Sequence, residues 1–130
     1  MDMNYHATFI SVSEDCSAKG EKPASKEGKT SVAEVQLEML GESPYRFTQE
    51  DVLFKSSTAA RENPELTKEE FFSRPQACLR ASALPKRYGW GIHFDSEGKA
   101  AAYPAGSDEY RKFHEDESLK QLRGMRSKRA

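Results

Sequence analysis

The sequence predicts a single α+β domain, with an antiparallel sheet of four or five strands and helices packed on one face. Three observations support this class. Short runs of apolar and β-branched residues recur, capped amphipathic segments lie between them, and 130 residues suit one domain with one core. An aromatic content of 10% and a formal net charge of -1 favour a folded chain over a disordered one. We therefore expect residues 1–130 to form one domain.

The first expected element is a strand over residues 5–13, where aromatic and β-branched residues dominate. The adjacent apolar residues Phe9 and Ile10 indicate burial on both faces of this strand. From residue 17 to 29 the composition changes to Lys, Glu, Gly, Pro and Ser without apolar periodicity. This composition predicts a mobile loop.

Three residues that can cap a helix are each followed, three positions on, by an acid, which is the pattern of a capping box. The pairs are Ser31 with Glu34, Thr48 with Asp51, and Thr67 with Glu70. The first predicts a helix over 32–40, and the second predicts one helical turn that runs into a short apolar strand at 52–54. The third predicts a helix with Phe71 and Phe72 directed inward.

A meander of three strands is expected next, over residues 76–81, 88–94 and 99–103. Residues 84–87 would connect the first two strands, and the turn residues 95–98 would close a hairpin between the last two. Ser107 and the acids after it predict a helix that carries Tyr110 and Phe113. Helical spacing resumes after Asp116 at Leu119, Leu122 and Met125, and residues 124–130 form a basic tail.

Composition and spacing exclude several classes of function. The nearly balanced charge gives no large field toward nucleic acid or an anionic membrane. No run of eighteen apolar residues and no signal-peptide pattern is present, so a cytoplasmic location is expected. Cys16 and Cys78 lie far apart without further Cys or His at ligand spacing, which argues against a zinc site and a disulfide framework. We expect no metal and no cofactor.

The segment from Cys78 to Asp95 is where a ligand is expected, because it holds the only tryptophan, flanking glycines and three cations. In a strand, Gly89, Gly91 and His93 would share one face and leave a strip of bare backbone. Such a strip permits close approach of a ligand, or equally of a helix of the same chain.

The cations Arg80, Lys86 and Arg87 would converge at one end of this strip, where arginine can hold a carboxylate or a phosphate. Plain surface cations are the alternative. The site predicted for an anionic small molecule comprises Arg80, Lys86, Arg87, Tyr88, Gly89, Trp90, Gly91 and His93.

Two other functions stay open. An enzyme could use His93 as a base, oriented by Asp95 two residues on or paired with Cys78 as nucleophile. Asp95 also suits the capping position of the hairpin turn, so no catalytic residue is assigned. Alternatively, the chain is a protein-interaction module or a homodimer through an exposed sheet edge, with the basic tail docking an acidic partner.

The run from Phe71 to Asp95, together with residues 44–45, residues 48–54 and the closing Met-Arg-Ser-Lys-Arg-Ala, resembles a family of small proteins that share a domain of unknown function. The Leu-Pro-Lys-Arg-Tyr-Gly-Trp-Gly part of that run is the most specific. Ala83 departs from the family pattern, which has proline there, and this puts the rigidity of the connection in question. The resemblance implies one whole domain and no particular chemistry.

Overall fold

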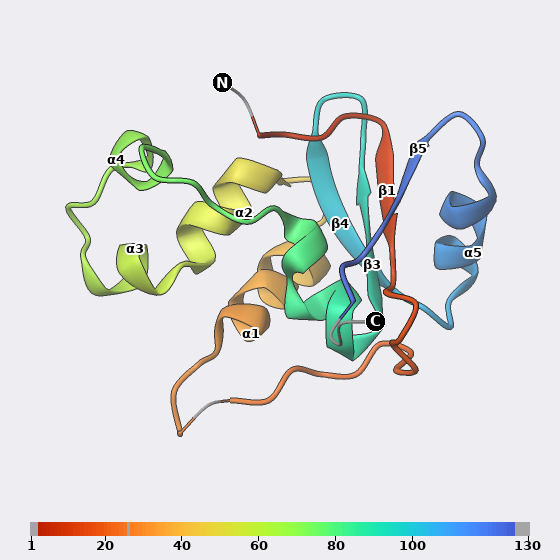
Figure 1. Cartoon of the computed structure of the whole chain (residues 1–130), viewed down its shortest axis with the longest axis horizontal. Coiled ribbons are helices and arrows are strands. Elements are labelled where there is room, and N and C mark those ends of the chain that lie inside the picture. Colours follow the sequence, from red (N-terminus) through yellow and green to blue (C-terminus); the bar gives the residue numbers. More distant parts are fainter. Residues whose placement is uncertain (1–2, 26, 127–130) are drawn as a thin grey trace.

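The computed structural model describes residues 3–25 and 27–126, which form a five-stranded sheet with helices on both sides (Figure 1). The strands are β1 (Thr8–Ser11), β2 (Phe47–Thr48), β3 (Trp90–Phe94), β4 (Lys99–Pro104) and β5 (Lys120–Arg123). The α-helices are α1 (Val32–Leu37), α2 (Gln49–Ser56), α3 (Thr58–Glu62), α4 (Lys68–Phe72) and α5 (Asp108–Glu115). Wider π-helical turns form η1 (Glu38–Glu42) and η3 (Leu84–Tyr88), and a 3-10 turn forms η2 (Leu79–Ala81).

The strand order is β2-β4-β3-β1-β5. Neighbouring strands are antiparallel except at one edge, where β5 runs parallel to β1 and Ile10 lies opposite Leu122. The predicted α+β class, single domain and number of strands are confirmed, but the sheet is mixed. The prediction of helix after Asp116 was wrong because β5 takes up the open hydrogen-bonding edge of β1, and Leu122 turns toward the core between exposed polar neighbours.

The main core lies between one face of the sheet and the layer formed by α1, α2 and the η turns. Its fully buried side chains are Ile10, Leu40, Val52, Leu79, Leu84, Ile92, Phe94 and Ala100. The opposite face is covered by α5, whose Tyr110 and Phe113 rings pack on Phe9 at centroid distances of 5.1 and 5.9 Å. Figure 1 shows α5 across the sheet from α1 and α2. Helices therefore lie on both faces rather than on one, because β1 is buried on both of its faces.

Local capping signals gave correct helix starts. The side-chain oxygens of Ser31, Thr48 and Thr67 each accept a hydrogen bond from the third helical N–H. The carboxylate of the acid three residues on accepts a hydrogen bond from the main-chain N–H of the capping residue. The Ser107 side chain caps α5 in the same way, but Tyr110 takes the place of the acid, so no capping box forms there. The predicted turn after β3 is also confirmed, since an Asp95 carboxylate oxygen accepts the N–H groups of Glu97 and Lys99, each at 2.9 Å.

Two predicted strands are wrong. Residues 52–54 continue α2 as helix, because fully buried Val52 packs in the core from the helical face. Residues 76–81 form an irregular segment and then η2. Their main chain is held by a side chain rather than by a neighbouring strand, since the Leu79 N–H donates to the buried amide oxygen of Gln49 at 2.8 Å.

In the early loop, residues 12–25 and 27–31 belong to no helix or strand, apart from a single bridge residue at Lys29. Its middle part is nevertheless anchored. The N–H groups of Gly20 and Glu21 donate to the Tyr88 carbonyl at 3.0 and 2.7 Å, and the Trp90 indole N–H donates to the Glu21 carbonyl at 2.8 Å. Its mobility stays a prediction, and residue 26 lies outside the described residues.

The start of the predicted basic tail is held against the domain. The Gly124 N–H donates to the Ser11 carbonyl at 2.7 Å, and the Met125 N–H donates to the Arg80 carbonyl at 2.8 Å. Residues 127–130 of the tail lie outside the described residues. Among the described helices, none has the length and apolar character that crossing a membrane requires.

Candidate functional site

The glycines of the expected ligand strip are occupied by contacts within the chain. A Cβ atom on Gly91 would lie 2.6 Å from Phe9 Cζ and from Tyr110 Cε2, so α5 roofs this part of β3. Gly89 is not part of the strand. It has φ of 81° and ends η3 in the left-handed conformation, with the Ala18 carbonyl where a Cβ would be. Close packing of the chain on itself, the alternative to a bound ligand, accounts for both glycines.

His93 lies beneath α5 in a cluster of rings. Its Nδ1 is 2.9 Å from the Tyr45 hydroxyl, which in turn is 2.8 Å from the Tyr103 hydroxyl. The imidazole stacks on Phe113 at a centroid distance of 3.9 Å and an interplanar angle of 15°. Burial lowers the pKa of His93, although attraction to Asp95 opposes this shift. The His93 imidazole is therefore half-buried and favours its neutral form.

Tyr45 is a part of this cluster that the sequence did not reveal. Its φ of 60° lies in the left-handed region, which is costly for a bulky residue. The Tyr45 N–H donates to the Ala100 carbonyl at 2.9 Å, and burial raises the pKa of its hydroxyl. Main-chain and side-chain bonds together hold the strained conformation. A tyrosine gives no local signal for positive φ, so this turn was not predictable.

The structure does not assemble the pairs that the enzyme hypothesis invoked. Asp95 is engaged in the hairpin turn. The Cys78 thiol lies beside the Tyr5 hydroxyl, and the Tyr5 ring packs on Phe94, whose side chain points into the core on the face of the sheet opposite His93. Burial and the neighbouring Cys78 thiol raise the pKa of Tyr5 to about 12.

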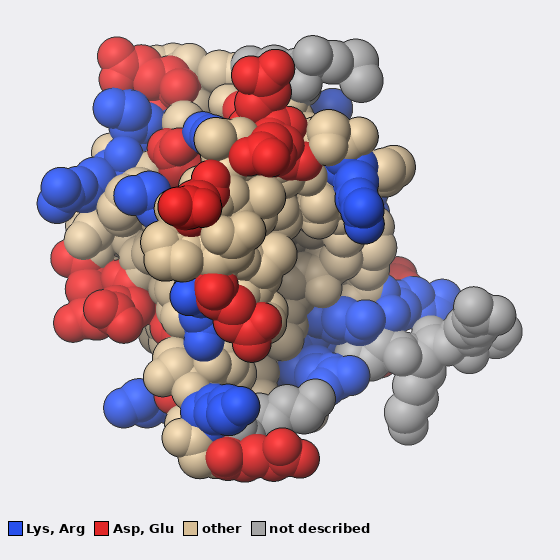
Figure 2. All heavy atoms as spheres, turned by 90° about the vertical axis from the view of Figure 1, so that its left-hand side faces the viewer, with Lys and Arg blue, Asp and Glu red and all other residues tan. Residues whose placement is uncertain are grey.

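The expected cations have different surroundings. Arg80 Nε donates to the Arg123 carbonyl at 2.7 Å, beside the end of β5. Lys86 and Arg87 belong to η3, whose first residues Leu84 and Pro85 are buried. Figure 2 shows acidic and basic side chains interspersed over the face that carries α3 and α4, so a local site and not a whole face must supply any selectivity for charge.

A cavity of about 670 Å³ lies between the early loop, α3 and η3, and we call it the cationic cavity. Its charged lining residues are Glu27, Lys29, Arg61, Glu62 and Arg87. Tyr88 and the hydroxyl-bearing Ser25, Thr30, Ser31 and Thr58 also line it. Arg87 and Tyr88 are thus the two expected site residues that lie together in one cavity.

Glu27 and Glu62 share this cavity with the three cations, but none of the ion pairs formed by the described residues involves Lys29, Arg61 or Arg87. Arg61 donates to the main-chain carbonyls of Thr30 at 2.6 Å and Ser56 at 3.4 Å, which ties the early loop to α3. Lys29 and Arg61 were not predicted, because they lie in polar stretches whose local pattern contains no site signal.

Trp90 lines another cavity of about 730 Å³, which meets the cationic cavity at Thr30 and which we call the acidic cavity. Its charged lining residues are Lys22, Glu34, Glu38 and Glu42. Three acids against one cation give this cavity the opposite charge to the one expected for an anion site. Trp90 and Arg87 therefore line cavities of opposite charge.

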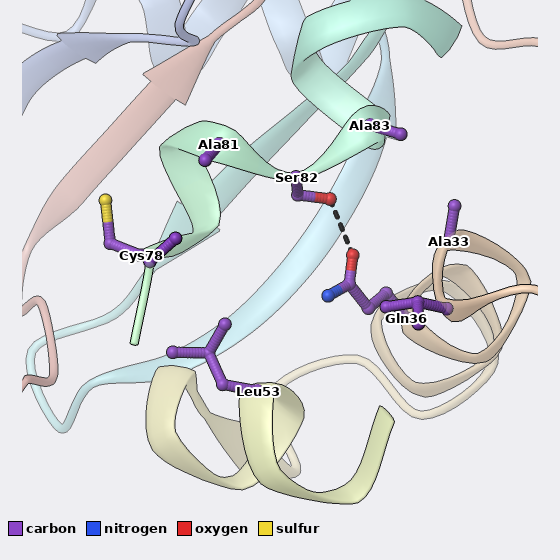
Figure 3. A pocket seen from close by; sticks show the side chains of 9 residues that line it. Ala33, Gln36, Leu53, Cys78, Ala81, Ser82 and Ala83 are labelled. Atoms are coloured by element: carbon purple, nitrogen blue, oxygen red, sulfur yellow. Dashed lines mark hydrogen bonds between the residues drawn. The ribbon is translucent and has the colours of Figure 1, made fainter. Parts of the chain in front are cut away.

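A third cavity of about 250 Å³ lies between α1, α2 and η2 (Figure 3), and we call it the apolar cavity. Its apolar lining residues are Val32, Ala33, Leu53, Ala77, Ala81 and Ala83. At its wall the Ser82 hydroxyl donates to Gln36 Oε1 at 2.6 Å, and Gln36 Nε2 donates to the Ser56 hydroxyl at 3.3 Å. The Cys78 sulfur points away from the side where Gln36 and Ser82 meet (Figure 3). The apolar and cationic cavities share Val32, Ala33 and Ala83.

Fold and cavities together define a small α+β domain whose surface hollows differ in charge. The chain belongs to a family of unknown function, DUF6157, whose profile matches residues 1–130. This confirms the resemblance to a domain-of-unknown-function family. No curated protein and no solved structure matches the chain.

Proposed function

We propose that this domain binds a small anionic molecule in the cationic cavity, with Arg87, Arg61 and Lys29 as the charged contacts. The observation that carries the proposal is that three cations surround one cavity and none of them has a carboxylate partner in the described part of the chain. Hydrogen bonds from cations to anions are stronger than those between neutral groups, so these side chains gain most from a bound anion.

The chemistry of the lining supports this class of ligand. An arginine fork can hold a carboxylate or a phosphate through two parallel bonds, and the surrounding hydroxyls can donate further ones. The N-terminus of α1 also borders the cavity, but its capping box already places the Glu34 carboxylate there. The anion is therefore held by side chains. The lining residues carry three cations and two carboxylates, a formal charge of +1, which favours a small anion over a polyanion such as nucleic acid.

We further propose that the domain acts in the cytoplasm. Cys16 and Cys78 are free and half-buried, and thiols stay reduced in that compartment. A lipid surface is not part of the proposal, and the oligomeric state is left open.

The test is Arg87→Ala, with Arg74→Ala as the matched control, because Arg74 is an exposed arginine that lines none of the three cavities described. Thermal unfolding is measured with inorganic phosphate, acetate and citrate at low ionic strength. At a ligand concentration ten times Kd, binding adds about 1.4 kcal/mol, which corresponds to a rise in Tm of about 5 °C for a domain of this size. We expect the rise in the wild type and in Arg74→Ala, and its loss in Arg87→Ala. The proposal would be refuted if no anion raises the Tm of the wild type. It would also be refuted if an anion raises the Tm of all three proteins by the same amount.

A further inference from the structure

We infer that the anion is amphipathic, with its charged head in the cationic cavity and an apolar tail in the apolar cavity. This inference rests on the proposed function, because it assigns the head to the same Arg87 site. It adds a second requirement on the ligand, namely a tail of defined chemistry, and it can fail while anion binding itself holds.

The first step is that the two cavities adjoin each other. Val32, Ala33 and Ala83 line both of them, so a tail that extends along these residues from a head beside Arg87 reaches the apolar cavity. Val32 at this junction keeps 38% of its surface exposed, which is unusual for a large apolar side chain in this structure. An apolar group that passes the junction would cover it.

The second step is the chemistry of the apolar cavity. Among the described residues no charged side chain lines it, and the polar groups of Gln36 and Ser82 already bond each other. Among the described residues, no buried side-chain nitrogen or oxygen lacks a hydrogen-bond partner. A polar tail would therefore lose its bonds to water and find no replacement, whereas an apolar tail loses nothing.

The third step is size. A volume of about 250 Å³ is below the range of about 300 to 1,000 Å³ that is usual for a whole drug-sized ligand. Because a water molecule occupies about 30 Å³ of liquid, the cavity corresponds to roughly eight waters and has room for a short alkyl chain. The larger cationic cavity, at about 670 Å³, holds the head and its remaining water.

The experiment measures Kd by calorimetry for a series of carboxylates with one head and different tails. Each buried methylene should tighten binding about fourfold, so hexanoate should bind about 15-fold more tightly than butyrate. Adipate has the length of hexanoate but a second carboxylate on its tail, and it should bind no more tightly than butyrate. The same comparison is made for a phosphate head by measuring hexyl phosphate and inorganic phosphate.

Ala81→Leu fills the apolar cavity without touching the cationic one, and Ala59→Leu is the matched control on the exposed surface of α3. We expect Ala81→Leu to reduce the gain from butyrate to hexanoate below threefold and to leave butyrate binding unchanged, while Ala59→Leu behaves as the wild type. The wild-type series alone decides the matter if Ala81→Leu does not fold.

The outcomes separate the two proposals. If anions bind through Arg87 but butyrate, hexanoate and adipate have the same Kd, the tail assignment is wrong and the anion site stands. If chain length matters equally in Ala81→Leu, the tail lies elsewhere and the assignment is also wrong. If no anion binds, or Arg87→Ala changes nothing, both proposals fail.

Discussion

Replacing Gly91 by alanine tests whether α5 or a ligand occupies the bare strip of β3. The new methyl group would lie 2.6 Å from Phe9 Cζ and 2.6 and 2.8 Å from two carbons of the Tyr110 ring. Neither ring can move aside easily. Phe9 is fully buried beneath α5, and the Tyr110 hydroxyl is bound by the Val12 N–H at 2.9 Å. The substitution must therefore push α5 away from the sheet.

The cost follows from this overpacking. An extra methyl group in a filled core costs about 1 to 3 kcal/mol. With an unfolding entropy of about 2.1 cal/mol/K per residue, the 130-residue chain loses about 4 °C of Tm for each kcal/mol. We therefore expect Gly91→Ala to lower Tm by about 4 to 11 °C, and the free energy of unfolding in urea to fall by the corresponding amount.

Gly106→Ala is the control, since Gly106 has an ordinary φ and the methyl group that alanine adds there would have Lys19 Cβ, at 3.9 Å, as its nearest neighbour. There the substitution should leave stability unchanged or raise it by up to about 1 kcal/mol, through the unfolded chain. In a Phe9→Leu background, which removes one of the two clashing rings, Gly91→Ala should cost less than in the wild type.

The opposite result is equally informative. If Gly91→Ala keeps its Tm and loses anion binding instead, the strip is open to a ligand and the packing of α5 against it is wrong. A change in stability equal to that of Gly106→Ala would refute the overpacking argument without supporting a ligand.

The remaining predictions concern pH and capping. Burial holds the pKa of His93 below its ordinary value, against attraction to Asp95 and Asp116, so the unfolded chain binds the proton more readily than the folded one. Stability should then fall as pH drops below about 6.5, and Tm measured from pH 8 to 5 should fall less in His93→Gln; an identical slope in both proteins would contradict the shift. Thr48→Ala removes the hydroxyl that accepts the Asp51 N–H at 3.3 Å and should cost about 1 kcal/mol in urea unfolding, whereas Thr48→Ser should cost much less; equal losses would assign the effect to something other than the cap.

The sequence predicted those elements whose signals are local. A capping box needs only two residues three positions apart, and the Ser31, Thr48 and Thr67 boxes all form. The hairpin turn likewise depends on Asp95 and Gly98, which are both part of the turn itself. Such signals act within one turn of the chain, so tertiary structure has little opportunity to override them.

Elements defined by distant partners were not predictable in this way. Strand β5 forms because it pairs with the open edge of β1, which lies more than a hundred residues earlier in the chain. The segment before η2 is irregular because the amide of Gln49 takes the Leu79 N–H. The candidate site shows the same limit. Arg87 and Tyr88 lay in the segment expected to bind a ligand, whereas Lys29 and Arg61 join them only through folding.

Gly89 shows how the correct segment was given an incorrect geometry. Its expected place in a strand led to the prediction of bare backbone beside Trp90. In the structure its left-handed conformation ends η3 and turns the chain, so that Tyr88 lines the cationic cavity and Trp90 lines the acidic one. The Tyr88 carbonyl at this turn accepts the N–H groups of Gly20 and Glu21, which fixes the early loop between the two cavities. The same glycine thus directs the side chains on either side of it to two different cavities of opposite charge, which meet at Thr30. Local backbone conformation, and not strand alternation, decides which of the two cavities each aromatic side chain lines.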